Sequence, residues 1–135
     1  MEHCTVLYEG WQMQCCGTPF STGGTVSWLV CTGEGVRLPI DAGNIDYCYD
    51  AHSQFDKRKL YVLEGRVTHI KALYCEYAPS KQDPKLLIAV NGTLINTDSA
   101  DGWDKPLGNM EFDSYIVELE NCSIRPAERG DVTFC

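Results

Sequence analysis

Thr25-Val26-Ser27-Trp28-Leu29-Val30-Cys31 is a run of β-branched and aromatic residues. In an extended chain alternate side chains point to the same face, so Val26, Trp28 and Val30 share one face. Glycines punctuate both ends of the run, at residues 23–24 and again at residues 33–35. The run therefore predicts a half-buried strand between two turns.

Similar strand-like segments lie on both sides of this run. Residues 4–8 form a short β-prone stretch, and residues 59–77 form the longest one. Gly65 interrupts the long segment, which predicts a bulge or a sharp bend. Residues 114–119 predict a further strand, and residues 124–126 follow it near the edge of the fold.

A hairpin is predicted where residues 86–90 and 93–96 flank Asn91-Gly92. Asn-Gly supplies the two positive-φ residues of a type I′ turn, whose twist matches that of paired strands.

One segment departs from the strand pattern. Between Asp41 and Phe55, large or apolar side chains recur at the spacing of one helical face. Asp41 is a suitable residue to cap such a helix. The tyrosines at 47 and 49 are equally suited to a strand, so both alternatives stay open. The recurring residues are Ile45, Cys48, Tyr49, His52 and Phe55.

Short strands, glycine-rich turns and at most one short helix predict an all-β fold, a single small antiparallel barrel. The rhythm Phe-x-x-Gly-Gly-x-Val-x-Trp from Phe20, followed by Gly-x-Val-x-x-Ile from Gly65, is typical of SH3-like or OB-like barrels. The length of 135 residues fits one domain over residues 1–135.

The charge balance bears on partners and compartment. The formal net charge is −8, from 19 acidic and 11 basic residues. Such a surface repels phosphate backbones and anionic lipids, so we expect neither nucleic acid nor a membrane as partner. The N-terminal residues lack a basic region followed by an apolar run, and no stretch approaches about 20 apolar residues. We therefore expect a cytoplasmic protein.

In a reducing compartment the eight cysteines should be thiols or metal ligands. Adjacent side chains in an extended chain point to opposite faces, so Cys15 and Cys16 do not easily hold one ion or close a disulfide. The chain has no C-x2-C pair, so a zinc site would need one of them to join distant ligands. Burial as small apolar residues is the simpler interpretation, and it fits Cys31, Cys75 and Cys122.

Cys48 and His52 are four residues apart and would share a face if their segment were helical. They then could form a thiolate–imidazole pair or two metal ligands, alongside Cys15 and Cys16. We predict no cofactor, with zinc as the weaker alternative. No catalytic motif such as G-x-S-x-G, H-E-x-x-H or a P-loop is present, which leaves enzymatic activity uncertain.

The stretch WQMQCCGTPF (residues 11–20) is interpreted as a turn motif. Trp11 and Phe20 would pack inward, residues 17–19 would reverse the chain, and one thiol would be buried beneath. Aromatic residues of a small barrel mostly fill its core, but Trp11 and Trp103 lie outside the predicted strands and are the better surface candidates. The candidate binding residues are Trp11, Cys15, Cys16, Phe20 and Trp103.

Residues 8–28, with the motif W-Q-x-x-C-C-G-x-P-F, resemble a family of small bacterial proteins of unknown function that carry this motif near the N terminus. Residues 65–70 and 101–103 fit the same layout more loosely. The resemblance implies a bacterial cytosolic origin and no known activity, so it supplies no catalytic residues.

The leading hypothesis is a module that binds a protein partner or a small ligand. The alternative is a metal- or thiol-dependent protein that uses Cys15 or Cys16 with Cys48 and His52.

Overall fold

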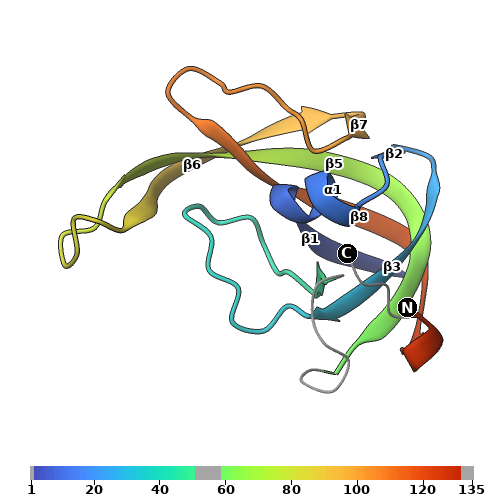
Figure 1. The fold of residues 1–135 in the computed structure, drawn as a ribbon. Coiled ribbons are helices and arrows are strands. Elements are labelled where there is room, and N and C mark those ends of the chain that lie inside the picture. Colours follow the sequence, from blue (N-terminus) through green and yellow to red (C-terminus); the bar gives the residue numbers. More distant parts are fainter. Residues whose placement is uncertain (1, 51–58, 132–135) are drawn as a thin grey trace.

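A computed structural model describes residues 2–50 and 59–131, which form a mostly β structure (Figure 1). Within these ranges, no helix has the length and hydrophobicity needed to cross a membrane. The elements, in chain order, are β1 (His3–Glu9), α1 (Gly10–Cys16), β2 (Phe20–Ser21), β3 (Thr25–Thr32), β4 (Tyr47–Tyr49), β5 (Tyr61–Pro79), β6 (Leu87–Thr97), β7 (Ser99–Ala100), β8 (Glu111–Pro126) and the 3-10 turn η2 (Arg129–Asp131).

The main sheet closes on itself. Its strand order is β3-β4-β1-β8-β5-β6, and β3 also pairs with β5, so that β3, β4, β1, β8 and β5 form a ring of hydrogen-bonded neighbours. All pairs are antiparallel except β1 and β4, which run parallel with Val6 opposite Tyr47. The prediction of a mostly β, strongly curled sheet with one short helix is confirmed. The expectation of a purely antiparallel sheet is wrong at this one pair.

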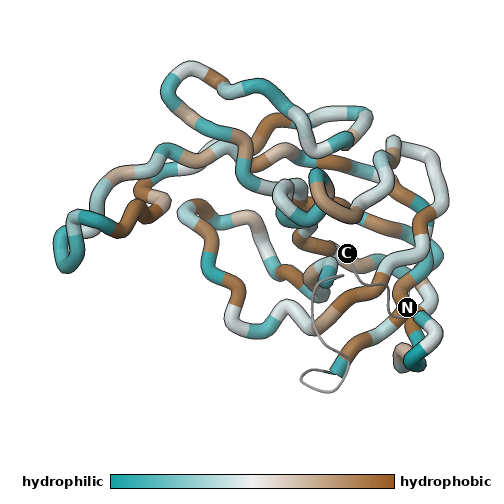
Figure 2. The backbone as a smooth tube through the Cα atoms, in the orientation of Figure 1, coloured by the Kyte–Doolittle hydropathy of each residue, from teal (hydrophilic) through white to brown (hydrophobic). Residues whose placement is uncertain are grey.

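Apolar side chains on the face that the curl turns inward make the main core. Val6, Trp28 and Leu63 are members of it, from three different strands. Trp28 and Val30 are buried in this core and Val26 packs against it, which confirms the predicted shared face. Figure 2 shows apolar segments along the strands of the ring. Each fully buried side chain of this kind contributes about 1.5–3 kcal/mol relative to exposure.

The predicted strands at residues 4–8 and 114–119 are confirmed as parts of β1 and β8. The bulge predicted at Gly65 is also present, because the β5–β8 register shifts between Glu64 and Arg66. Opposite it, Asn121 adopts a positive φ of 53°. The two irregularities together bend β5 and β8 sharply enough for the sheet to close.

The hairpin predicted at Asn91-Gly92 is wrong. These residues lie inside the continuous strand β6, where Gly92 is opposite Cys75 of β5. The chain turns earlier, between Pro79 at the end of β5 and Leu87 at the start of β6. Gly92 is instead a point of close packing, because a Cβ there would stand 3.0 Å from Pro39 Cγ. The glycine allows the 33–46 loop to lie against the sheet.

The helix predicted between Asp41 and Phe55 is wrong over residues 41–50, and residues 51–58, which include His52 and Phe55, lie outside the described residues. Tyr47–Tyr49 forms β4 instead. It pairs with β1 on one side and β3 on the other, so tertiary pairing decides between the two open alternatives. The one described α-helix is α1, within the stretch interpreted as a turn.

Candidate functional site

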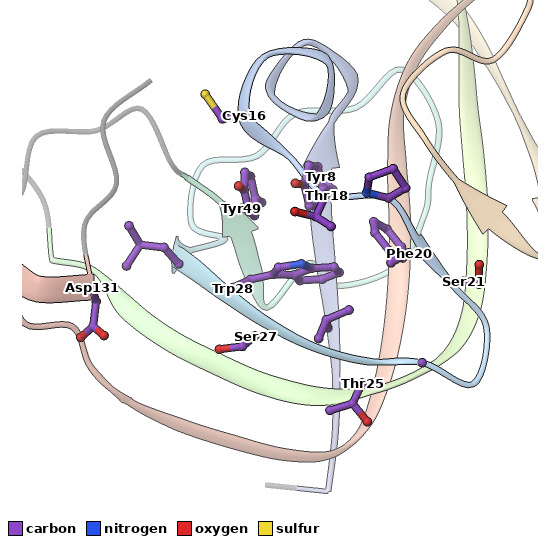
Figure 3. Close-up of a pocket in the computed structure, with 14 residues that line it drawn as sticks. Tyr8, Cys16, Thr18, Phe20, Ser21, Thr25, Ser27, Trp28, Tyr49 and Asp131 are labelled. Carbon is purple, nitrogen blue, oxygen red and sulfur yellow. The ribbon is translucent and has the colours of Figure 1, made fainter.

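A pocket of about 600 Å³ opens beside the end of α1, between β2, β3 and β4 (Figure 3). Aromatic rings form its inner wall and hydroxyl groups lie around its rim. Its described lining residues are Tyr8, Cys16, Thr18, Pro19, Phe20, Ser21, Gly24, Thr25, Val26, Ser27, Trp28, Leu29, Tyr49 and Asp131.

Four aromatic side chains hold one another in place at the inner wall. The rings of Tyr8 and Tyr49 stack with their centroids 3.9 Å apart. Trp28 meets Tyr8 edge-on at 5.2 Å and Phe20 at 5.0 Å. Such pairs add about 0.5–1.5 kcal/mol each beyond the burial of their area. The wall is therefore formed before any ligand arrives.

Local structure at the end of α1 shapes the upper part of the pocket. The Gly17 N–H donates to the carbonyls of Gln12 and Met13, at 3.1 and 3.2 Å, and ends the helix. A Cβ on Gly17 would lie 2.7 Å from Met13 Cα, so only glycine fits there. The Gln12 amide donates to the Tyr49 carbonyl at 3.1 Å and ties the helix to β4.

The polar groups at the pocket are hydroxyls and one carboxylate. Thr18 is exposed on the rim, whereas Thr25 and Ser27 are exposed on the opposite side of β3 from Trp28 (Figure 3). The Arg125 guanidinium, 2.8 Å from Asp131, together with the Glu128 N–H, lowers the pKa of Asp131 to about 2. Asp131 is thus ionised at neutral pH and its charge is already paired.

Burial and a hydrogen bond with Tyr49 raise the pKa of Tyr8 well above its usual range. The phenol therefore stays neutral at physiological pH. The buried phenol is thus part of the wall, and the exposed Thr18 hydroxyl and the paired carboxylate can form hydrogen bonds to a ligand.

The structure brings two of the candidate binding residues together. Cys16 and Phe20 both line the pocket, whereas Cys15 is exposed. Trp11 is 52% exposed and Trp103 is 68% exposed, on a loop. The expectation that these two tryptophans reach the surface is confirmed, and the interpretation that Trp11 packs inward is wrong.

The interpretation that one thiol of the adjacent pair is buried is also wrong. Cys15 is exposed and Cys16 is half-buried, with the two sulfurs 3.2 Å apart. A seven-residue helix, not a tight turn, carries them. Cys16 is disulfide-bonded, so the expectation of thiols or metal ligands throughout is wrong for this residue.

The residues selected from the sequence do not include Tyr8, Trp28 or Tyr49, which line the pocket. Alternation along β3 signals an inward Trp28. Nothing local places Tyr49 beside Tyr8, because that contact depends on the parallel β1–β4 pair.

No group of three or more His, Cys, Asp or Glu residues within residues 2–50 and 59–131 is arranged to hold a metal ion. Cys48 lies on β4 directly opposite Cys31, with which it shares a side-chain hydrogen bond. His52 lies outside the described residues. Cys31, Cys75 and Cys122 are buried, as predicted.

Comparison with known proteins relates the chain to one family. No curated protein and no solved structure matches the chain. A family of unknown function, DUF6578, matches it over residues 2–121. The bacterial origin and the role of W-Q-x-x-C-C-G-x-P-F as a family motif stay predictions. Since the match covers most of the chain, the protein belongs to the DUF6578 family.

Proposed function

We propose that this protein is a small-ligand binding module whose site is the aromatic-walled pocket beside α1. The observation that carries the proposal is a preformed cavity of about 600 Å³ backed by four interlocked rings. Ligand sites are typically cavities of about 300–1,000 Å³ with apolar walls and a few polar groups, and the mouths of curled sheets are common places for them.

The walls favour a flat, uncharged molecule. A planar ring can lie against Trp28 and Phe20 while its polar edge meets the hydroxyl of Thr18 at the rim. The formal net charge of −8 disfavours a polyanionic ligand. The Asp131 carboxylate is neutralised by Arg125, so it creates no strong demand for a cation.

The test uses a library of small planar aromatic compounds, screened by two-dimensional NMR on the isotope-labelled protein. We expect binders that shift the indole resonance of Trp28 and the amides of Thr25 and Ser27. The best binder is then titrated against two variants. Thr18→Trp fills the rim, because Thr18 is an exposed lining residue on the Trp28 side of β3 (Figure 3). Asn96→Trp adds the same side chain at an exposed position on β6, outside the lining.

Thr18→Trp should weaken binding at least about tenfold, a loss of about 1.4 kcal/mol, while Asn96→Trp should leave the affinity unchanged. The proposal fails if no library member shifts pocket resonances at millimolar concentration. It also fails if both variants bind the best compound as tightly as the natural sequence does.

A further inference from the structure

Two buried cysteines from opposite ends of the sequence meet in the main core. Cys4 of β1 and Cys122 of β8 have their sulfurs 3.2 Å apart. Both side chains are buried, at 4% and 6% exposure. A disulfide bond is about 2.05 Å long, so the two sulfurs need to approach by only about 1 Å to form one.

The fold provides this contact through the paired irregularities of β5 and β8. The register places Cys4 opposite Leu119, not opposite Cys122. The positive φ of Asn121 redirects the strand just before Cys122. A Cβ on Gly65 would stand 3.3 Å from the Cys122 sulfur, so the glycine leaves space for it. Two unusual backbone positions thus favour this one sulfur–sulfur contact.

A second pair lies at another seam of the ring. Cys31 of β3 and Cys48 of β4 are directly opposite in antiparallel register. Bonds from Gly33 N–H to the Asp46 carbonyl and from Asp50 N–H to the Leu29 carbonyl flank the pair by two residues on each side. The pair is therefore of the hydrogen-bonded type, with about 5.5 Å between its Cα atoms. That spacing lies within the Cα range of disulfides, and the two thiols already share a hydrogen bond across the seam.

We propose that Cys4–Cys122 and Cys31–Cys48 are two disulfide-forming sites that a low-molecular-weight organic disulfide oxidises in the folded protein. One cysteine thiolate attacks a sulfur of the small disulfide, forming a mixed disulfide and releasing one small thiol. The second thiolate attacks the protein sulfur of that mixed disulfide and releases the second small thiol. Each cysteine pair loses two electrons and two protons, and the small disulfide gains them.

Both pairs border pockets through which a small disulfide can approach. Cys4 lines one of about 290 Å³, beside Thr5 and Asp46. Cys31 and Cys48 line another of about 460 Å³. The products would join β1 to β8 and β3 to β4, so two seams of the ring would become covalent.

Burial raises the pKa of Cys4, and its hydrogen bond with Cys122 adds to the effect. The hydrogen bond with Cys31, followed by burial, raises the pKa of Cys48. Thiolates are therefore scarce at neutral pH, so oxidation should be slow there and faster as the pH rises.

The experiment incubates the folded full-length protein with hydroxyethyl disulfide at pH 8.5, blocks free thiols with iodoacetamide and maps the cross-links by mass spectrometry without reduction. Trypsin cleaves after Arg37, and chymotrypsin cleaves after Tyr8 and Trp28, so Cys4 and Cys31 fall into separate peptides. We expect linked peptides for both pairs and a rate that falls at lower pH. A parallel sample oxidised in concentrated urea should show scrambled pairings.

Three serine variants complete the test. Cys122→Ser should abolish only the link to Cys4, and Cys48→Ser should abolish only the link to Cys31. Cys75→Ser is the matched control, a buried cysteine on β5 whose loss should leave both links intact. The proposal is overturned if the folded natural sequence gives neither link, or if its pairings match those formed in urea. The natural-sequence map decides this even if a variant does not fold.

Discussion

Gly65 is the residue that fixes how closely β5 approaches β8. A Cβ there would stand 3.2 Å from the Glu120 carbonyl oxygen and 3.3 Å from the Cys122 sulfur. Backbone and buried neighbours of this kind have little room to yield. We expect Gly65→Ala to lower the free energy of unfolding by about 1–3 kcal/mol, the usual cost of overpacking. Urea denaturation followed by circular dichroism measures the change.

Gly130→Ala is the matched control, because no atom lies within 4 Å of the Cβ position there and its φ is not positive. Its unfolding midpoint should stay close to that of the natural sequence. Equal midpoints for the two alanine variants would contradict the account of the β5–β8 bend.

Asp131 at the pocket rim provides a prediction about pH. Its pKa of about 2 lies below the ordinary value near 3.9, because Arg125 and the Glu128 N–H bind the ionised form. The ionised carboxylate therefore favours the folded state above about pH 4, and this contribution disappears as the pH falls toward 2. Carboxyl-carbon NMR should show Asp131 titrating near pH 2.

Arg125→Gln should return the pKa of Asp131 toward its ordinary value. Arg66→Gln is the control, since Arg66 pairs with Glu120 instead, and it should leave the Asp131 titration in place. An Asp131 titration unaffected by Arg125→Gln would show that the pair does not hold in solution.

At the scale of elements, β6 is an edge strand that carries one bulge, at Val90, but no protecting charge or proline. It has β5 on one side and no described strand on the other. Residues 86–97 include no charged residue and no proline. Long apolar edges of this kind pair with other chains unless charges or prolines interrupt them. The exposed apolar residues on and beside it are Leu86, Leu87, Ile88, Val90 and Ile95.

We expect the protein to self-associate through this edge as its concentration rises into the millimolar range. Leu87→Lys should suppress the association, because a lysine at this exposed position would be buried, at a cost, in the contact between two chains. Light scattering coupled to size-exclusion chromatography gives the mass at each concentration. Ser123→Lys, at an exposed position on β8, makes the same change in net charge. The prediction is wrong if the natural sequence stays monomeric throughout, or if both lysine variants behave alike.

β6 also shows why local sequence rules succeed for some elements and fail for others. The β-branched run at β3 becomes a strand because its neighbours on both sides bury it. The Asn91-Gly92 dipeptide is a strong turn signal, yet it is paired residue by residue with Glu76 and Cys75. The turn forms at the polar stretch after Pro79, so a long-range register overrode a local preference. The bulge at Gly65 was predictable, because glycine inside a strand pattern has few other uses.

The candidate site was predictable to the same limited degree. Phe20 and Cys16 belong to an unusual local stretch and could be selected from it. Tyr8 and Tyr49 reach the pocket only through the parallel β1–β4 pair, which joins segments about 40 residues apart. β4 is also short, and its sequence fits a helix as well as a strand. A single sequence carries no local signal for such a pairing.

At the scale of the whole molecule, closure of the ring divides the sheet into two parts. One part is the ring of strands, and the other is a projecting arm made of the end of β5 and the start of β6. The first half of β5 pairs with both β3 and β8. The start of β6 pairs only with the far end of β5, beyond the residues that pair with β8. Figure 1 shows this arm extending away from the curled sheet. Opening the arm exposes little buried surface, whereas opening the ring exposes the main core.

Native-state hydrogen exchange tests this division. Amides of residues 62–72 should exchange only through global unfolding, because their opening breaks the ring. Amides of residues 87–90 should exchange through local opening, at least about 100-fold faster, which corresponds to a difference of about 2.7 kcal/mol in opening free energy. Adding urea should accelerate the first group strongly and the second group little, since only the first opening exposes much surface. Similar protection and similar urea dependence in both groups would mean that the arm and the ring unfold as one unit, and that ring closure does not divide the molecule.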